Sequence, residues 1–413
     1  MGLPRAGSPR IRRRVIVKNI AIVGASLAGV SAIEALRDLD YSGAIHLIGA
    51  EPELPYTRPP LSKEALADGE LAVETLALRE PGWYAEKGVD LHLGTHIASL
   101  DTSERLLHDE HGASHSYDGL VIATGSGARQ LPASMISPQA QDDVFTLRTL
   151  ADARRINERL DRGRRLTVIG GGFVGMEVAA TAAKLGVIVT VVDVAAMPMS
   201  RVFGPTIGKW FNAMHRRNGV DVRCSTSVER IEKSGSDVVV VLVGGERLTT
   251  DTVLVGIGGV PAVDWLAGSG VAVGNGVECT PDLQTSVPGV VAAGDVASWR
   301  NDTFGEVMRV EHWTNAVEQG RHVAGRLLGD TSNFASVPYF WTDQFDAKLR
   351  FCGRASADDD IFIESQNEKS LVALFGRVGV LRGVVCINAP RKLAQYRTAI
   401  GDSQIWNDVA RSA

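Results

Sequence analysis

The stretch Thr167-Val-Ile-Gly-Gly-Gly-Phe-Val-Gly-Met-Glu177 decides the fold of this chain. An apolar run of β type leads into Gly170, Gly172 and Gly175, and an alanine-rich helical pattern follows. Each glycine has a separate task. Gly170 makes a tight turn, Gly172 lets backbone amides approach a pyrophosphate, and Gly175 lets the helix pack closely on the strand. The pattern predicts a strand, a turn and a helix whose N-terminus binds a dinucleotide.

A carboxylate follows at the distance that such a unit requires. Asp193 ends the next apolar strand, residues 187–192, and lies 18 residues after Gly175. At that place a carboxylate accepts a hydrogen bond from the adenosine ribose. A glycine triplet alone is weak support for a dinucleotide site, but strand, triplet, helix, strand and acid in register are strong support.

An earlier segment repeats this unit. The apolar residues 20–23 lead into Gly24, and Ala-Ser-Leu-Ala-Gly29 and a helical pattern follow. Ser26 takes the middle glycine position and adds a small side chain where a backbone should approach phosphate. Glu51 lies 22 residues after Gly29, again at the ribose distance. Two such units in one chain imply two bound dinucleotides.

Length and composition limit the class of protein. A chain of 413 residues is too long for one core, and we expect about two to four domains. The hydrophobic fraction of 45% and the 44 glycines are typical of a globular α/β protein. The net charge of −5 argues against a nucleic-acid partner, because no overall positive field is present to neutralise phosphates.

The cysteines and the N-terminus predict a cytoplasmic protein without a membrane partner. Cys224, Cys279, Cys352 and Cys386 are too widely spaced for a redox dithiol, a zinc site or an iron-sulfur cluster. No apolar run is long enough to span a bilayer. The arginine-rich residues 5–14 have no apolar core after them, so they do not fit a secretory signal.

The order of the patterns predicts three domains. We interpret the two strands that end in glycine-rich turns, residues 120–125 and 252–261, as crossovers between the two nucleotide-binding domains. Residues 287–295 then return the chain to the first domain. We expect helices at 150–162, 205–218 and 390–400, and a hairpin turn at 377–379. The predicted fold is α/β, with two Rossmann-like domains and a small α+β domain. The expected bounds are 18–128 with 257–331 for the first dinucleotide-binding domain, 129–256 for the second, and 332–413 for the C-terminal domain.

Three further features bear on a site. The rigid, proline-rich residues 54–63 could hold Arg58 and Lys63 against a ligand. Asp295 ends a strand without a local partner, although it could equally cap the next helix. His108, His111 and His115 lie in a hairpin region, where histidines are more often solvated than metal-bound, and we expect no metal.

The chain resembles the FAD-dependent, NADH-dependent ferredoxin reductases of bacterial oxygenase systems, the family of putidaredoxin reductase and the dioxygenase ferredoxin reductases. The Ala-Thr-Gly125 motif and both glycine motifs are shared with a wider flavoprotein class. More specific to the family are Arg58-Pro-Pro-Leu-Ser-Lys63, Glu311-His-Trp-Thr-Asn315 and Phe340-Trp-Thr-Asp-Gln344. The resemblance covers nearly all of the chain from Lys18 onward.

The resemblance, added to the two glycine motifs, implies the residues of the site. Lys63 and Trp313 would lie beside the flavin ring, and Glu177 would pair with Lys63 and moderate its charge. These three residues are the candidate catalytic residues. Ala50 departs from the family, because an acid often stands there, and Glu51 is then the ribose candidate. The candidate FAD-binding residues are Gly24, Ala28, Gly29, Glu51, Arg58, Lys63, Ile97, Thr124, Arg148, Asp295 and Trp313. The candidate NADH-binding residues are Gly170, Gly172, Gly175, Glu177, Asp193, Arg201 and Gly258.

The resemblance implies transfer of hydride from NADH to FAD, and of single electrons to an iron-sulfur ferredoxin that serves a haem monooxygenase or a Rieske dioxygenase. An alternative is an NADH oxidase or another pyridine nucleotide oxidoreductase of the same fold. Those that work through a cysteine beside the flavin are disfavoured, since no cysteine precedes Cys224. A second alternative is a redox-signalling flavoprotein with slow turnover. We expect ferredoxin to dock on a basic patch, unless that patch is only a solvated helix face. The patch residues are Arg382, Arg391, Lys392 and Arg397.

Overall fold

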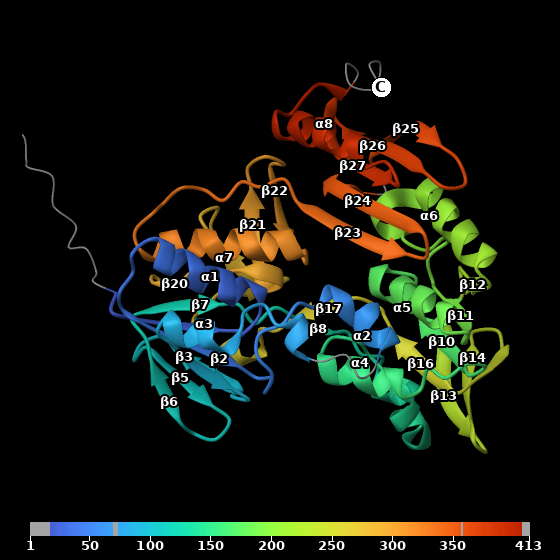
Figure 1. Cartoon of the computed structure of the whole chain (residues 1–413), viewed down its shortest axis with the longest axis horizontal. Coiled ribbons are helices and arrows are strands. Elements are labelled where there is room, and N and C mark those ends of the chain that lie inside the picture. The colour runs from blue at the N-terminus through green and yellow to red at the C-terminus, as the bar shows by residue number, and fades with distance from the viewer. Residues whose placement is uncertain (1–16, 69–72, 357, 407–413) are drawn as a thin grey trace, which may run out of the picture.

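The structure is a computed structural model that describes residues 17–68, 73–356 and 358–406. The arginine-rich residues 5–14 and the last part of the predicted C-terminal domain lie outside the described residues. Figure 1 shows two α/β units, at the left and the lower right, and a third unit above the second. Within the described ranges, no helix is long and apolar enough to cross a membrane.

The first α/β unit is built on a parallel five-stranded sheet in the order β20-β7-β1-β2-β3. Its strands are β1 (Asn19–Val23), β2 (Ala44–Gly49), β3 (Val89–Leu93), β7 (Gly119–Ile122) and β20 (Val290–Ala292). The central strands are mostly apolar and buried because both faces of the sheet are covered. Since β20 comes from far along the chain, two separate segments complete this sheet.

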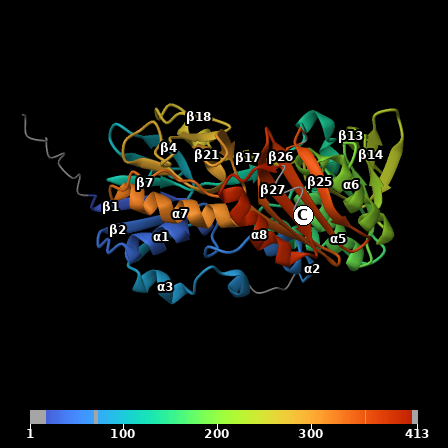
Figure 2. The same ribbon diagram turned by 90° about the horizontal axis from the view of Figure 1, so that it is seen from above.

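Two helices lie side by side on one face of this sheet, as Figures 1 and 2 agree. They are α1 (Leu27–Asp38) and α7 (Trp313–Leu327). Gly320 permits their close approach, because a Cβ there would lie 2.3 Å from the carbonyl oxygen of Ala28. Small sheets cover the other face and close a separate apolar core. They are formed by β4 (Ile97–Asp101), β5 (Leu106–Asp109) and β6 (Ser114–Ser116), and by β18 (Val273–Gly274), β19 (Gly276–Cys279), β21 (Ala297–Asn301) and β22 (Glu306–Arg309).

The second α/β unit repeats the architecture with the sheet order β12-β11-β10-β16-β9, again parallel. Its strands are β9 (Val144–Phe145), β10 (Arg165–Ile169), β11 (Ile188–Val192), β12 (Asp221–Arg223) and β16 (Thr252–Val255). Its helices are α4 (Leu150–Asn157), α5 (Phe173–Lys184) and α6 (Ser200–Arg217). A small antiparallel sheet packs against it, formed by β13 (Val228–Ser234), β14 (Asp237–Leu242) and β15 (Arg247–Thr250).

Short elements connect the two units. The antiparallel pair β8 (Ser126–Ala128) and β17 (Gly259–Pro261) joins the two crossovers, which were both predicted from their glycine-rich turns. The short helices are α2 (Glu64–Ala67) and α3 (Pro81–Glu86). The single 3₁₀ turns are η1 (Pro59–Ser62), η2 (Val73–Leu76), η3 (Ala133–Met135), η4 (Pro138–Asp143), η5 (Asp264–Leu266) and η6 (Gly294–Val296).

The C-terminal unit is an antiparallel five-stranded sheet in the order β23-β24-β27-β26-β25, with one helix against it. The predicted hairpin turn at 377–379 is present, because β26 ends at Arg377 and β27 begins at Val380. Its strands are β23 (Tyr339–Gln344), β24 (Ala347–Gly353), β25 (Asp360–Gln366), β26 (Leu371–Arg377) and β27 (Val380–Ile387), and its helix is α8 (Pro390–Gly401). The α/β class with two Rossmann-like units and a small third unit is therefore confirmed.

Two helices differ from their predicted bounds. Helix α4 begins at Leu150 behind a capping box made by Thr149 and Asp152, but it ends at Asn157 and not at residue 162. A turn with Gly163 in the left-handed region redirects the chain into β10 there. Helix α6 begins at Ser200, five residues before the prediction, and bends at Gly204, whose φ is 75°. Pro205, which marked the predicted start of this helix, follows directly after the bend.

A buried histidine joins the second unit to the C-terminal sheet. His215 on α6 is fully buried, and its Nε2 lies 2.9 Å from Oε1 of Gln344 on β23. Burial lowers the pKa of His215 to about 4, and the hydrogen bond to Gln344 only partly opposes this. The folded protein therefore keeps this imidazole neutral over a range of pH in which an unfolded chain would protonate it.

We expect this histidine to make the protein less stable in acid. Between about pH 6.5 and 4 the unfolded chain binds a proton at His215 and the folded chain does not, so stability falls as pH falls through that window. The full loss is ~3 kcal/mol for one such group. Urea denaturation from pH 4 to 7 measures it. His215→Gln should flatten the dependence, whereas His111→Gln on the exposed hairpin should not.

Candidate functional site

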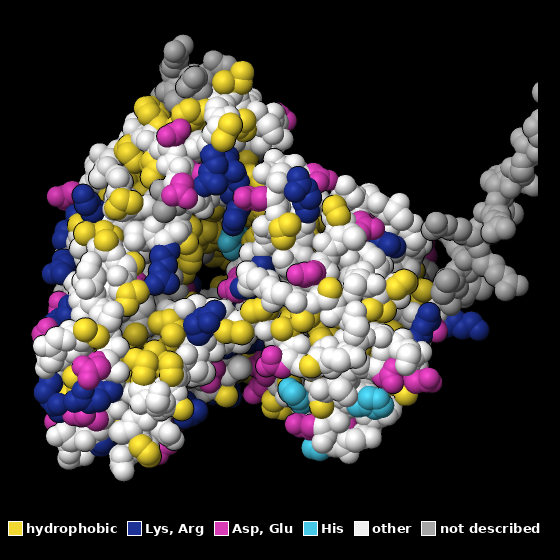
Figure 3. All heavy atoms as spheres, turned by 180° about the vertical axis from the view of Figure 1, so that it is seen from behind, with side chains coloured by type: hydrophobic (Ala, Val, Ile, Leu, Met, Phe, Trp, Pro, Cys, Tyr) yellow, Lys and Arg dark blue, Asp and Glu magenta, His cyan; other side chains and the backbone are white. Residues whose placement is uncertain are grey.

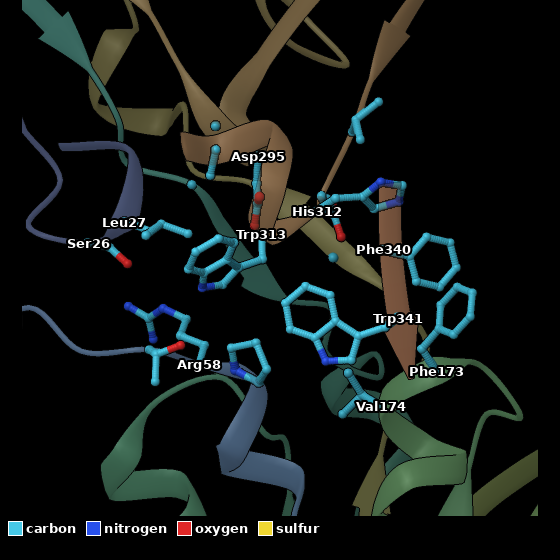
Figure 4. Close-up of a pocket in the computed structure, with 18 of the residues that line it drawn as sticks. Ser26, Leu27, Arg58, Phe173, Val174, Asp295, His312, Trp313, Phe340 and Trp341 are labelled. Carbon is cyan, nitrogen blue, oxygen red and sulfur yellow. The ribbon is translucent and has the colours of Figure 1, made fainter. Parts of the chain in front are cut away.

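A cavity of about 640 Å³ opens where the three units meet. Its wall takes residues from the first α/β unit, from the start of α5 in the second, and from β23 and β24 in the third. Figure 3 shows this hollow between the lobes, bordered by hydrophobic and basic side chains. Figure 4 shows the side chains that point into it from separate elements.

The fingerprint of the second unit has the geometry that its glycines require. At Gly170 φ is 112°, and a Cβ there would lie 2.3 Å from the carbonyl oxygen of Gly256. A Cβ on Gly175 would lie 2.1 Å from the carbonyl oxygen of Gly170, so the helix can approach the strand only without it. At Gly172 the space around the Cβ position is open within 4 Å. The backbone here is therefore accessible to a ligand.

The first unit repeats this arrangement. Gly24 has φ of 122°, and a Cβ there would lie 2.0 Å from the carbonyl oxygen of Ala123. Gly29 packs against Gly24, because a Cβ built on Gly29 would lie 2.4 Å from the carbonyl oxygen of Gly24. Ser26 takes the N-cap position of α1 with extended backbone and lines the cavity beside Ala28. Its hydroxyl makes no capping hydrogen bond.

Both helix N-termini fit a dinucleotide. Neither Ser26 at the start of α1 nor Gly172 at the start of α5 caps its helix with a side chain. Backbone N–H groups of the first turn therefore keep their capacity to donate to phosphate oxygens, and the helix dipole adds to the attraction. The residues present thus fit one dinucleotide at α1 and a second at α5.

The two candidate ribose acids have different surroundings. Asp193 accepts hydrogen bonds from the amides of Gly171, at 2.7 Å, and Ala195, at 2.9 Å, so it ties β11 to the fingerprint loop. Glu51 pairs with Arg58 at 2.6 Å and accepts a hydrogen bond from the Tyr56 hydroxyl. Both carboxylates stand after strand ends beside their loops, and each has acceptor capacity left for a ribose hydroxyl.

Glu177 lies where the three units touch. Its Oε2 is 2.8 Å from Nζ of Lys63 and 2.5 Å from Oγ of Ser62, and its Oε1 accepts from Oγ1 of Thr342 at 2.6 Å. The predicted pair of Lys63 and Glu177 is therefore present. Glu177 is buried and has acceptor bonds on both oxygens, so the carboxylate is fixed in position at the cavity wall.

A second ion pair crosses between units at the cavity wall. Arg148, from the loop before α4, donates from Nη2 to Oδ2 of Asp295 at 3.0 Å. Asp295 does not cap a helix but lies within the η6 turn and faces the cavity. Thr124 donates to the carbonyl oxygen of Ala262 at 2.8 Å and so fastens the two crossovers together.

Aromatic residues form the remaining wall. Trp313 at the start of α7 and Trp341 on β23 meet nearly edge to face, with ring centroids 6.1 Å apart. Figure 4 shows Trp313 beside Asp295 and Arg58, while Phe340 lies near His312 and Phe173. Burial lowers the pKa of His312 to about 3, so its imidazole is neutral. Trp313 is 38% exposed and gives the cavity an apolar edge open to solvent.

Some predicted residues lie outside the cavity wall. Ile97 is buried in the core between the first sheet and the β4-β5-β6 sheet. Arg201 is exposed near the start of α6, and Gly258 lies before β17, where its carbonyl oxygen accepts from the amide of Arg129. Sequence reasoning did not assign roles to Ser62, Thr342 or His312. All three residues belong to the segments that are specific to the family, and this was the signal in the sequence that could have identified them.

The cysteines do not reach the site. None of the described residues that line the cavity is a cysteine, and all four cysteines are free thiols. Burial raises the pKa of Cys279 and Cys386 to about 12 and that of Cys352 to about 11. These thiols stay protonated near neutral pH, so they are poor nucleophiles.

Two dinucleotide-binding units facing one cavity define the class of flavin-dependent pyridine nucleotide oxidoreductases. Comparison with known proteins agrees. The family model described as pyridine nucleotide-disulphide oxidoreductase matches residues 18–320, and the model described as reductase C-terminal matches residues 339–410. The putidaredoxin reductase of Pseudomonas putida is 35% identical, over 93% of this chain and 92% of its own length. The ferredoxin–NAD⁺ reductase component of the biphenyl dioxygenase system of Paraburkholderia xenovorans is 35% identical, over 94% of both chains.

Solved structures narrow the assignment. The reductase in a covalent putidaredoxin reductase–putidaredoxin complex has a TM-score of 0.89 with 34% identity, covering 94% of this chain and 93% of that one. A water-forming NADH oxidase from Lactobacillus brevis has a TM-score of 0.85, covering 95% and 92% of the two chains, but at 20% identity it shares the fold alone. The chain therefore belongs to the ferredoxin reductase family of bacterial oxygenase systems.

Removing the Glu177 carboxylate should loosen the junction between units. Glu177→Ala leaves the half-buried Lys63 ammonium without its partner and two hydroxyls without their acceptor. We expect the free energy of unfolding to fall by ~3 kcal/mol or more, as for other broken buried pairs. Urea denaturation measures the change. Glu229→Ala removes an exposed carboxylate paired with Arg230 and is the matched control, with little expected effect. Wild-type stability in Glu177→Ala would contradict the role of this junction.

Proposed function

We propose that the protein is an NADH-dependent ferredoxin reductase that feeds a haem monooxygenase or a Rieske dioxygenase. The observation that carries the proposal is the single cavity bordered by both dinucleotide units, with Lys63, Glu177 and Trp313 at its wall. Bound FAD would accept a hydride from NADH and release its electrons singly, as a one-electron iron-sulfur partner requires. Facing units would bring the nicotinamide close to the flavin.

We propose a role for each candidate residue according to the domain in which it lies. The FAD domain comprises residues 18–128 and 257–331, the NAD domain 129–256 and the C-terminal domain 332–413, as the pairing of β20 with β7 supports. Lys63 and Trp313 would contact the flavin ring, and Asp295 with Arg148 would hold the ribitol side. The other proposed FAD-binding residues are Gly24, Ala28, Gly29, Glu51, Arg58, Ile97 and Thr124. The proposed NADH-binding residues are Gly170, Gly172, Gly175, Glu177, Asp193, Arg201 and Gly258.

The aromatic wall would keep water from the reacting rings. Phe173, Phe340 and Trp341 supply an apolar surface, and the neutral His312 beside Phe340 adds no charge to it. The exposed edge formed by Trp313 and Val174 would remain the route for electrons to leave toward ferredoxin. We place the reaction in the cytoplasm, where NADH is available and free thiols persist.

An anaerobic assay tests the function. Purified protein should release FAD on denaturation, be reduced by NADH, and then reduce a [2Fe-2S] ferredoxin with turnover. Rapid oxygen consumption without ferredoxin would favour the oxidase alternative, although no cysteine lies among the described residues of the cavity wall. Slow reduction by NADH and negligible turnover with ferredoxin would favour a signalling flavoprotein.

The position of Asp193 predicts a preference for NADH over NADPH. A carboxylate at the ribose would accept from its hydroxyl but repel a 2′-phosphate. We expect Asp193→Ala to weaken both coenzymes, because it also releases the Gly171 amide, and to shrink the NADH/NADPH ratio of kcat/KM about tenfold, which corresponds to ~1.4 kcal/mol. Glu229→Gln, on an exposed strand of the same domain, is the control and should keep the ratio. An unchanged ratio in Asp193→Ala would place the ribose elsewhere.

Most of the basic side chains in the patch proposed to bind ferredoxin are paired with carboxylates. Lys392 pairs with Glu364, Arg382 pairs with Glu306 at 2.6 Å, and Arg397 lies 3.9 Å from Glu318. Such pairing cancels much of their field, so exposed Arg391 would contribute most to steering an acidic partner. This is a narrower docking site than the four basic residues suggested from the sequence.

Arg391→Glu should therefore raise the KM for ferredoxin several-fold at low salt and leave ferricyanide reduction unchanged. Arg105→Glu is the matched control, because it reverses an exposed charge on the turn between β4 and β5, at the opposite end of the molecule in Figure 1. Stopped-flow reduction of ferredoxin at several salt concentrations measures both variants. If the two behave alike, the electrostatic contact lies away from α8.

A further inference from the structure

Two histidines and an aspartate meet on the first sheet, away from the cavity. His46 on β2 stands directly opposite Asp90 on β3, and His92 lies two residues further along β3 on the same face. Nδ1 of His46 and Nε2 of His92 are each 3.1 Å from Oδ2 of Asp90, and they are 3.3 Å from each other. None of these residues lines the catalytic cavity.

The spacing of the three atoms is that of metal ligands. A tetrahedral Zn²⁺ with ligand bonds near 2.0–2.1 Å holds neighbouring ligand atoms about 3.3 Å apart. The triangle formed by His46, Asp90 and His92 has sides of 3.1, 3.1 and 3.3 Å. Imidazole nitrogen and carboxylate oxygen are both zinc ligands. The three atoms therefore need little movement to bind one ion.

Hydrogen bonds alone satisfy this triangle poorly. The carboxylate of Asp90 can accept from both rings only if both nitrogens carry protons, and then the two N–H groups of His46 and His92 point into the same small space. One divalent cation accepts a lone pair from each of the three atoms at once. It also adds positive charge beside the carboxylate.

The surroundings leave room for an ion and support its ligands. The side chains of His46, His92 and Asp90 are 29%, 26% and 61% exposed, so the site opens to solvent while its imidazoles are held. His115 on β6 packs edge-on against His92 at 5.2 Å, and Asp109 lies 3.4 Å from His115. Figure 3 shows histidines gathered beside acidic side chains at this end of the molecule.

We propose that His46, Asp90 and His92 bind one divalent transition-metal ion of the zinc type, with water as the fourth ligand. The ion would fasten edge strand β3 to β2. These strands lead into the loop of Glu51, where the amide of Gly94 donates to the Glu51 carbonyl oxygen at 3.0 Å. The role is structural, and it differs from the sequence-based expectation of no metal, which considered His108, His111 and His115 instead.

Calorimetric titration of the FAD-loaded full chain with Zn²⁺, after treatment with a chelator, tests the site. We expect one ion per chain on the wild type, and at least a tenfold loss of affinity in His46→Gln and in His92→Gln. The matched control is His111→Gln, since His111 belongs to the same unit and its side chain is 75% exposed. It should bind as the wild type does.

A thermal readout covers variants that fold poorly. Saturating Zn²⁺ should raise the melting temperature of the wild type and of His111→Gln, but not that of Asp90→Asn or His92→Gln. NADH–ferricyanide activity should stay the same in all of them, because the site lies outside the cavity. Equal Zn²⁺ affinity in wild type and His92→Gln, or no Zn²⁺ binding by the wild type, would overturn the proposal.

Discussion

Glu177 receives polar contacts from the two other units that border the cavity, and the geometry of the site depends on it. It projects from α5 of the second unit, receives Lys63 and Ser62 from the first, and receives Thr342 from the third. A buried carboxylate that lost these donors would be strongly destabilised, so the three segments are held together. The same contact keeps Lys63 at the cavity wall, where the proposed flavin would lie.

Close backbone approach is the second constraint on the site. Built side chains at Gly24 and Gly170 would collide with the carbonyl oxygens of the neighbouring crossovers, Ala123 and Gly256. The loops can therefore turn beneath their helices only with glycine at these two positions. The result is a pair of uncapped helix N-termini directed at one cavity, which is the arrangement that two dinucleotides require.

The third unit contributes chemistry as well as shape. Its β23 supplies Thr342 to the junction and Phe340 and Trp341 to the wall, so three consecutive residues of one strand serve two purposes. On α8, Lys392 and Arg397 are paired with acids, so the positive field of this helix is weaker than its sequence suggests.

Sequence alone determined the two strand-turn-helix units, the hairpin before β27 and the pairing of Lys63 with Glu177, because local periodicity, glycine stereochemistry and family-specific motifs specify them. It could not place Thr342 on Glu177, 165 residues away, or Arg148 on Asp295, 147 residues away. Nor could it bring His46 to His92. Contacts of this kind depend on how elements far apart in the sequence pack in space, which local periodicity does not specify. Tertiary structure alone therefore decided that Arg148 pairs with Asp295, that Thr342 donates to Glu177 and which residues share the cavity.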